Sequence, residues 1–188
     1  IRIGILGNIG SGKSYVANQF GYPVFNADYE VSKLYKKNKK IFFKLKKKLP
    51  KYINTYPINK KQITKAILTN KTNLKKIVNI VHKEVRKKMK LFIKKNKNKK
   101  IVILDIPLLL ENKINRKGDI LIFVDSKKKE IEKRLVKRED FNRKLFYKFK
   151  KIQYNSSYKK RKSHFIIKNN FIKKNVNRDI RKILKEIL

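Results

Sequence analysis

The chain of 188 residues contains no cysteine, which excludes disulfide bonds and thiolate metal sites. Its two histidines, His82 and His164, lie far apart in the sequence, so a histidine-based metal site is not expected. No apolar stretch approaches the roughly 20 residues that a membrane helix needs. The first apolar run, residues 3–6, is only one strand long and does not resemble a signal peptide. We therefore expect a soluble, cytoplasmic protein without a membrane segment.

Acidic residues are also scarce, because 13 Asp and Glu oppose 54 Lys and Arg, giving a net charge of +41. A charge of this size suggests a nucleic-acid partner when it is considered alone. Here the basic residues are nearly all lysine and are spread along the whole chain, and Asn and Ile are abundant too. Lys, Asn and Ile are encoded by A/T-rich codons, so compositional drift explains the excess. We expect no specific nucleic-acid partner, and a basic nucleic-acid-binding protein remains the alternative.

Glycine and proline are few, six and four residues, which indicates regular elements with short joints. Apolar and β-branched runs predict five strands, at residues 2–6, 23–25, 101–104, 120–124 and 165–167. Apolar residues at helical spacing predict helices at residues 13–20, 27–37, 41–49, 59–69, 74–92, 127–137, 143–156 and 176–187. Alternating strands and helices predict an α/β protein with a parallel sheet covered on both faces.

Residues 7–14, Gly-Asn-Ile-Gly-Ser-Gly-Lys-Ser, match the phosphate-loop pattern G-x-x-x-x-G-K-[ST] in full. The motif follows a strand and opens a helix, where backbone N–H groups and the helix N-terminus face an anion. We expect Lys13 to reach the β- and γ-phosphates and the Ser14 hydroxyl to bind Mg²⁺. The residues expected to hold ATP are Gly10, Ser11, Gly12, Lys13, Ser14 and Tyr15. The motif alone does not distinguish a kinase from a GTPase or a motor.

Further segments narrow this choice, since 188 residues suit a small-molecule kinase with a lid. Val16-Ala17 follows the phosphate loop, and Asn26-Ala27-Asp28 follows the second strand. Residues 105–112, Asp-Ile-Pro-Leu-Leu-Leu-Glu-Asn, fit the pattern D-x-P-L-L-x-E-x. The remaining matched segments are Asn79-Ile80-Val81-His82, Val124-Asp125, Arg134-Leu135, Arg138 and Gln153. Together these segments resemble the dephospho-CoA kinase family over essentially the whole chain.

The resemblance implies a three-layer P-loop kinase fold, with a five-stranded parallel sheet in the order 2-3-1-4-5. It implies one domain over residues 1–188, with a core at about 1–30, 100–140 and 163–188. A helical acceptor-binding region is expected at about 31–98, and a helical lid at about 139–162. The implied reaction is phosphorylation of the ribose 3′-hydroxyl of dephospho-CoA by ATP with Mg²⁺. Another small P-loop kinase is the alternative, and we expect a monomer or weak oligomer.

The family match also suggests roles for charged residues. Asp28 is expected to orient or deprotonate the attacking hydroxyl, although a helix N-cap is the alternative. Asp105 ends a buried strand and is expected either to hold the Mg²⁺ shell or to bond loop backbone. Arg134 and Arg138 are four residues apart on one expected helix. We expect Arg138 to neutralise phosphate charge, whereas Arg134 either joins it or pairs with Glu130.

Residues expected on the acceptor side are His82, Pro107, Leu108 and Glu111, together with Asp28. The chain also departs from the family pattern at several positions. Tyr15 replaces a Thr, Asn26 an Asp, Lys60 an Arg and Lys83 a Pro, while Ser163-His164 replaces Ala-Asp. The changes at Asn26 and Lys60 bear most directly on how substrate would be held.

Overall fold

The computed structural model describes residues 1–139 and 141–188. The chain forms two compact units. The sheet unit comprises Ile1–Asn26 and Asn96–Leu188, and the helical unit comprises Ala27–Lys95. The five strands found among the described residues all belong to the sheet unit.

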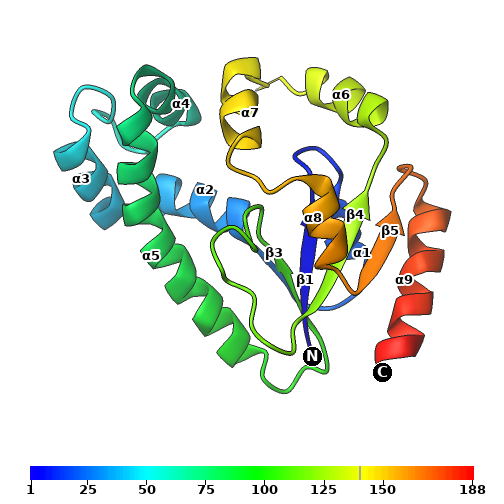
Figure 1. The fold of residues 1–188 in the computed structure, drawn as a ribbon. Coiled ribbons are helices and arrows are strands. Elements are labelled where there is room, and N and C mark those ends of the chain that lie inside the picture. Colours follow the sequence, from blue (N-terminus) through cyan, green and yellow to red (C-terminus); the bar gives the residue numbers. More distant parts are fainter. Residues whose placement is uncertain (140) are drawn as a thin grey trace. The chain divides into compact units, whose positions relative to one another are not determined.

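The sheet unit is built on a five-stranded, wholly parallel sheet in the order β2-β3-β1-β4-β5 (Figure 1). Its strands are β1 (Arg2–Gly7), β2 (Val24–Asn26), β3 (Val102–Asp105), β4 (Ile120–Asp125) and β5 (Phe165–Lys168). The predicted fold class and strand order are confirmed, and every predicted strand lies within one residue of its observed bounds. β1 is central, so the loop that follows it emerges between β3 and β4.

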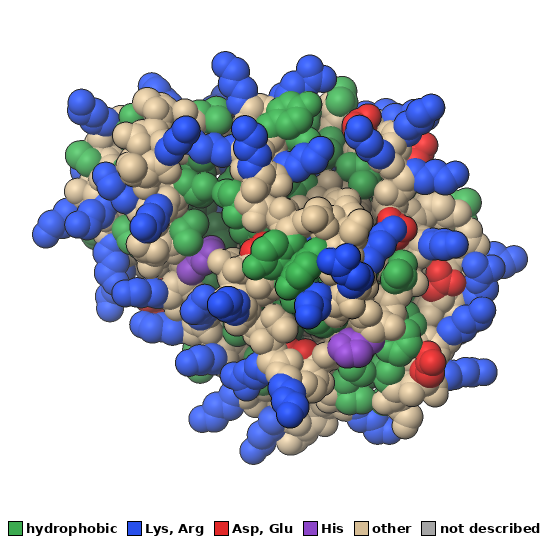
Figure 2. Space-filling view, viewed as in Figure 1, with side chains coloured by type: hydrophobic (Ala, Val, Ile, Leu, Met, Phe, Trp, Pro, Cys, Tyr) green, Lys and Arg blue, Asp and Glu red, His purple; other side chains and the backbone are tan. Residues whose placement is uncertain are grey.

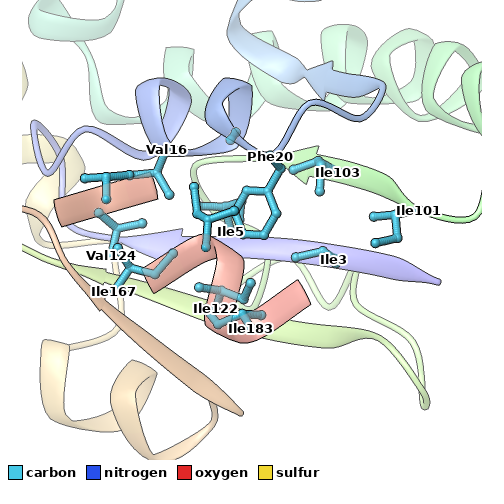
Figure 3. Packing of buried hydrophobic residues seen from close by; sticks show 13 residues of the cluster. Ile3, Ile5, Val16, Phe20, Ile101, Ile103, Ile122, Val124, Ile167 and Ile183 are labelled. Carbon is cyan, nitrogen blue, oxygen red and sulfur yellow. The ribbon is translucent and has the colours of Figure 1, made fainter. Parts of the chain in front are cut away.

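One face of this sheet carries the main hydrophobic core. Helices α1 (Lys13–Gln19) and α9 (Lys173–Ile187) pack there, because both present an apolar stripe. In Figure 3, Phe20 and Val16 of the α1 segment reach toward Ile5 and the neighbouring strand residues. The buried cluster consists of Ile3, Ile5, Val16, Ala17, Phe20, Ile101, Ile103, Ile122, Val124, Ile167, Val176, Ile180 and Ile183. This packing holds the carboxyl ends of the strands, and the loops that follow them, in a fixed order.

The opposite face is covered by segments with weaker sequence signals. Leu109 and Leu121 pack so closely over Gly4 that a Cβ there would lie 3.3 and 2.9 Å from them. Helix α8 (Ser156–Arg161) also lies on this side, in front of the sheet in Figure 1. Helices α6 (Lys128–Val136) and α7 (Arg143–Lys150) complete the unit.

The prediction of one helix over residues 143–156 is wrong. Helix α7 ends at Lys150, the chain is non-helical to Asn155, and α8 begins at Ser156. Asn155 caps the new helix by accepting a hydrogen bond from the Tyr158 N–H at 2.7 Å. The break lets the backbone between the two helices bond to a distant turn of the sheet unit, as described below.

The helical unit contains α2 (Ala27–Lys37), α3 (Lys39–Lys48), α4 (Lys60–Thr69) and α5 (Lys71–Lys95). Local polar caps set the helix starts. Asn38 caps α3, while Asn59 and Gln62 form a capping box on α4. The apolar stripe of α5 buries Ile77, Val81 and Met89. Glu30 of α2 forms an ion pair with Lys88 of α5 at 3.1 Å, which ties the first and last helices of this unit together.

Basic side chains cover both units. Figure 2 shows Lys and Arg distributed over the whole visible face, without one dominant basic stripe. Among residues 1–139 and 141–188, no helix is long and apolar enough to cross a membrane.

His164, for which the sequence suggests no catalytic role, has a structural one. Its ring Nδ1 accepts a hydrogen bond from the Leu121 N–H at 2.9 Å, and its backbone N–H donates to the Leu121 carbonyl.

Candidate active site

The phosphate loop joins β1 to α1 at the carboxyl edge of the sheet. Gly12, just before α1, has φ of +84°, a left-handed conformation that favours glycine. The Lys13 ammonium folds over the loop and donates to the carbonyls of Gly7, at 3.3 Å, and Asn8, at 2.8 Å. The loop therefore places a cation and the helix N-terminus on the same side of its backbone, as phosphate binding requires.

Neighbouring elements press against the loop from two sides. A Cβ at Gly10 would lie 3.0 Å from Ile131 and from Leu135 of α6. A Cβ at Gly12 would lie 2.4 Å from the Asn169 amide nitrogen, beyond the end of β5. The Ser11 carbonyl accepts hydrogen bonds from Ser126 and Asn169, each at 2.9 Å. The loop is thus held from both flanks by side chains that the sequence motif does not include.

Asp105, Asn26 and Ser14 meet beside the loop. Asp105 is only 3% exposed and lies opposite Asn26 in the β2–β3 register. The Asn26 amide donates to Asp105 at 2.6 Å and to the Ser14 hydroxyl at 3.4 Å. Asp105 also hydrogen-bonds the Ser14 side chain. The sequence correctly placed Asp105 at the end of a buried strand, and the structure adds that Asn26 is its amide partner.

Burial raises the pKa of Asp105 above its ordinary value, and its hydrogen bonds and the charge of Lys13 oppose that shift only in part. A nearby cation would favour the ionised carboxylate. Carboxylate and hydroxyl oxygens are the ligands that Mg²⁺ prefers. The donor set of Ser14 and Asp105 therefore fits a magnesium ion beside the phosphate loop.

Glu111 lies in the turn after β3 and is engaged with the segment between α7 and α8. Its carboxylate accepts from the Tyr154 N–H at 2.8 Å and forms an ion pair with Lys159 at 3.3 Å. Lys159 is only 1% exposed, and burial lowers its pKa despite the charge of Glu111. The Gln153 amide donates to the Pro107 carbonyl at 3.2 Å. Sequence reasoning missed Lys159, because one buried lysine gives no signal among so many exposed ones.

Helix α8 is also attached to the phosphate loop and to the end of β4. The Asn8 amide donates to the Ser156 hydroxyl at 2.9 Å, and Lys160 pairs with Asp125 at 2.7 Å. These contacts, with those of Glu111, join three catalytic-edge loops to one short helix. Asn8 was not predicted, since the phosphate-loop pattern leaves the second position open, and Ser156 was not, since its bond to Asn8 spans 148 positions.

The two arginines expected on one helical face are separated. Helix α6 ends at Val136, so Arg134 lies within it and Arg138 lies beyond it, which corrects the predicted shared face. The Arg134 guanidinium stacks over the Phe171 ring at 4.2 Å, whereas Glu130 pairs with Lys133 at 3.7 Å. The pairing of Arg134 with Glu130 considered from the sequence is therefore replaced by a stack with an aromatic ring. Phe171 was not predicted.

Two expected site residues belong to the helical unit. Asp28 is exposed in the first turn of α2, two residues along the chain from Asn26. Because α2 begins at Ala27, Asp28 is inside the helix and not at the N-cap position considered from the sequence. His82 is partly buried on α5, and its pKa is lowered by burial and then by the charge of Arg86. Lys60 and Lys83 are both exposed.

The chain was compared with protein-family models, with curated proteins and with solved structures. A family model described as dephospho-CoA kinase matches residues 1–174. The dephospho-CoA kinase of Wolbachia pipientis wMel is 35% identical over 170 residues, covering 88% of this chain and 87% of its own. The crystal structure of TT1252 from Thermus thermophilus has a TM-score of 0.78 at 25% identity, with coverage of 100% and 98%. The dephospho-CoA kinase from Campylobacter jejuni, at 22% identity, shares the fold with a TM-score of 0.65 over 99% and 96% of the two chains.

Proposed function

This chain belongs to the dephospho-CoA kinase family, and we propose that its sheet edge carries out that family's reaction with the residues described above. The reaction transfers the γ-phosphoryl group of ATP to the ribose 3′-hydroxyl of dephospho-CoA, giving CoA and ADP. The observation that carries the assignment is the Ser14–Asp105–Asn26 cluster beside a complete phosphate loop, in a chain whose family match covers residues 1–174.

ATP is held by the backbone N–H groups from Gly10 to Tyr15. Lys13 exchanges its two loop carbonyls for oxygens of the β- and γ-phosphates, because a charged acceptor forms the stronger hydrogen bond. The buried Ser11 hydroxyl, which has no hydrogen-bond partner in the part of the chain that the structure describes, is a further donor within the loop. The Asn169 bond to the Ser11 carbonyl supports this proposal, since it fixes the position of the Ser11 peptide within the loop.

A magnesium ion would be held by the Ser14 hydroxyl and by Asp105. When bound, it would offset the negative charge that develops on the phosphates. Asn26 keeps the Asp105 carboxylate directed toward Ser14, which fixes both oxygens before the ion arrives. The amide at position 26 therefore serves as a positioning group, in place of the carboxylate that the family pattern carries there.

The acceptor is activated by Asp28, which accepts the proton of the attacking 3′-hydroxyl. The new bond joins the 3′-oxygen to the γ-phosphorus, and the bond to the β–γ bridging oxygen breaks, so that ADP leaves. Arg138 neutralises charge on the transferred group as the predicted lid, at about residues 139–162, closes, with movement confined to the part that precedes the contacts of Gln153, Tyr154 and α8 with the sheet unit. His82, Pro107, Leu108 and Glu111 contribute to the acceptor side, with Glu111 acting through its hold on Tyr154 and Lys159.

We further propose that the protein is a cytoplasmic monomer or weak oligomer without a specific nucleic-acid partner. The dispersion of basic residues over the visible face supports the last point, because a nucleic-acid footprint concentrates charge on one surface (Figure 2).

The assignment is tested by turnover with a panel of acceptors. The protein is incubated with ATP and Mg²⁺ and with dephospho-CoA, a nucleoside monophosphate or shikimate in separate reactions, and ADP release is measured. We expect kcat/KM for dephospho-CoA to exceed the other values by at least about 100-fold, as a site built for one polar acceptor allows. Turnover on another acceptor with none on dephospho-CoA would reject the assignment.

A further inference from the structure

Phe171 adopts a backbone conformation that is unfavourable for its side chain. Its φ is +64°, in the left-handed region where a bulky residue is uncommon. Asn169 stabilises this conformation, because its Oδ1 accepts the Phe171 N–H at 2.9 Å. Asn169 is itself 2% exposed, and its Nδ2 donates to the carbonyl of Ser11 in the phosphate loop. Asn169 therefore links the unfavourable backbone conformation of Phe171 to the phosphate loop.

The Phe171 ring lies between the phosphate loop and α6. Its Cε1 would be 3.1 Å from a Cβ at Gly12, and its face supports the Arg134 guanidinium at 4.2 Å. The helix that carries Arg134 packs Leu135 against Gly10 of the same loop. The stacked pair thus connects two elements that both contact the loop. Arg134 is exposed, so its guanidinium keeps edges available to an anion.

We propose that Phe171 is a positioning residue for ATP, which holds the Arg134 guanidinium beside the phosphate loop. Stacking on a ring restricts a long, flexible side chain, so less conformational entropy is lost when the guanidinium meets the nucleotide. The cost is the left-handed backbone at residue 171, which glycine would adopt without strain. This inference rests on ATP binding at the phosphate loop and does not depend on which acceptor is phosphorylated.

The key variant is Phe171→Gly, which removes the ring and relieves the backbone. We expect an unchanged or higher Tm, because glycine suits a φ of +64°. We expect the Kd for a non-hydrolysable ATP analogue, measured by calorimetry, to rise about 2- to 10-fold, the range for ordering one flexible side chain on binding. KM for ATP should rise in parallel, while kcat at saturating ATP changes less than about twofold.

Three further variants distinguish positioning from general disturbance. Phe171→Tyr keeps the ring and should restore ATP affinity to within about twofold of wild type. Arg134→Lys keeps the charge but loses the planar stack, and adding it to Phe171→Gly should weaken binding no further. Lys113→Gly is the matched backbone control, because Lys113, with φ of +50°, is the other non-glycine residue with positive φ in the described chain. It should leave ATP affinity unchanged.

The proposal is overturned if Phe171→Gly binds the analogue as tightly as wild type, or if the effects of Phe171→Gly and Arg134→Lys simply add. Because the readout is binding of the nucleotide alone, failure of the acceptor assignment would leave these outcomes interpretable. Loss of analogue binding in the wild-type protein would instead reject the nucleotide site itself.

Discussion

At the scale of single residues, Asp28, two residues beyond β2, and Asp105, the last residue of β3, have different environments. Asp105 is buried and bonded to Asn26, whereas Asp28 is exposed in the first turn of α2. A buried, hydrogen-bonded carboxylate suits a fixed metal ligand, and an exposed one can exchange a proton with a substrate. The two residues should therefore respond differently to the same change from Asp to Asn.

Asp28→Asn should lower kcat by about 10²- to 10⁴-fold, because an amide cannot accept the proton of the attacking hydroxyl. ATP affinity should remain within about threefold of wild type, since no phosphate contact is assigned to Asp28. Steady-state kinetics and nucleotide calorimetry measure the two effects. Glu30→Gln is the matched control, because Glu30 is the other acid in the first turn of α2 and its loss should leave kcat nearly unchanged. An unaltered kcat for Asp28→Asn would leave Asp28 as a helix-stabilising charge only.

Asp105→Asn should lower activity without lowering the thermal stability of the protein at pH 7. The folded-state pKa of Asp105 is raised, so the protonated carboxyl group stabilises the fold in acid. This contribution to stability is lost as the pH rises from the pKa of the unfolded state through that of the folded state. Replacing it with a neutral amide should therefore make Tm equal to or higher than that of wild type at pH 7, and the advantage should shrink toward pH 4. Activity at limiting Mg²⁺ should fall about 10- to 100-fold. A lower Tm at pH 7 would contradict this account of the buried carboxylate.

At the scale of elements, α8 fastens the loops of the catalytic edge through a buried ion pair. Lys159→Met should destabilise the fold by about 3 kcal/mol, because the Glu111 carboxylate would remain buried without its cation. Glu111→Gln should have a similar cost, and the double variant should cost clearly less than the sum. Urea unfolding of the four proteins measures the coupling.

The neighbouring lysine provides the control for that measurement. Lys160 pairs with Asp125, but both side chains are more than one-third exposed, at 38% and 35%. Lys160→Met should therefore cost less than about 1 kcal/mol. Equal costs at positions 159 and 160 would show that burial of the Glu111 pair has no special importance.

The sequence predicted those elements whose signal is local. β1 and α5 were located because their buried positions follow a β-branched run and a helical stripe that the sequence shows directly. Lys13 was located because it is part of a sequence motif. The break after Lys150 was missed, since it depends on bonds from residues 153 and 154 to Pro107 and Glu111, more than 40 positions away. The left-handed Phe171 was missed for the same reason, because the Asn169 bond to Ser11 spans 158 positions.

At the scale of the whole molecule, the net charge of +41 affects stability more than recognition. Like charges repel in the compact state, and salt shortens the range of that repulsion. Tm should therefore rise by several degrees when NaCl is increased from about 20 to 300 mM, a range in which the Debye length falls well below 10 Å. Sucrose at matched osmolality supplies a control without screening. A Tm that is flat or falls with salt would contradict a cost from self-repulsion.

The central claim concerns which atom receives the phosphoryl group. In a reaction of the wild-type protein with ATP, Mg²⁺ and dephospho-CoA, the product is purified and analysed by mass spectrometry and ³¹P NMR. The account predicts one added phosphate, a new phosphomonoester on the ribose 3′-oxygen and an unaltered diphosphate bridge. A phosphate on any other position, or no phosphorylated product while ATP is consumed with a different acceptor, would contradict it.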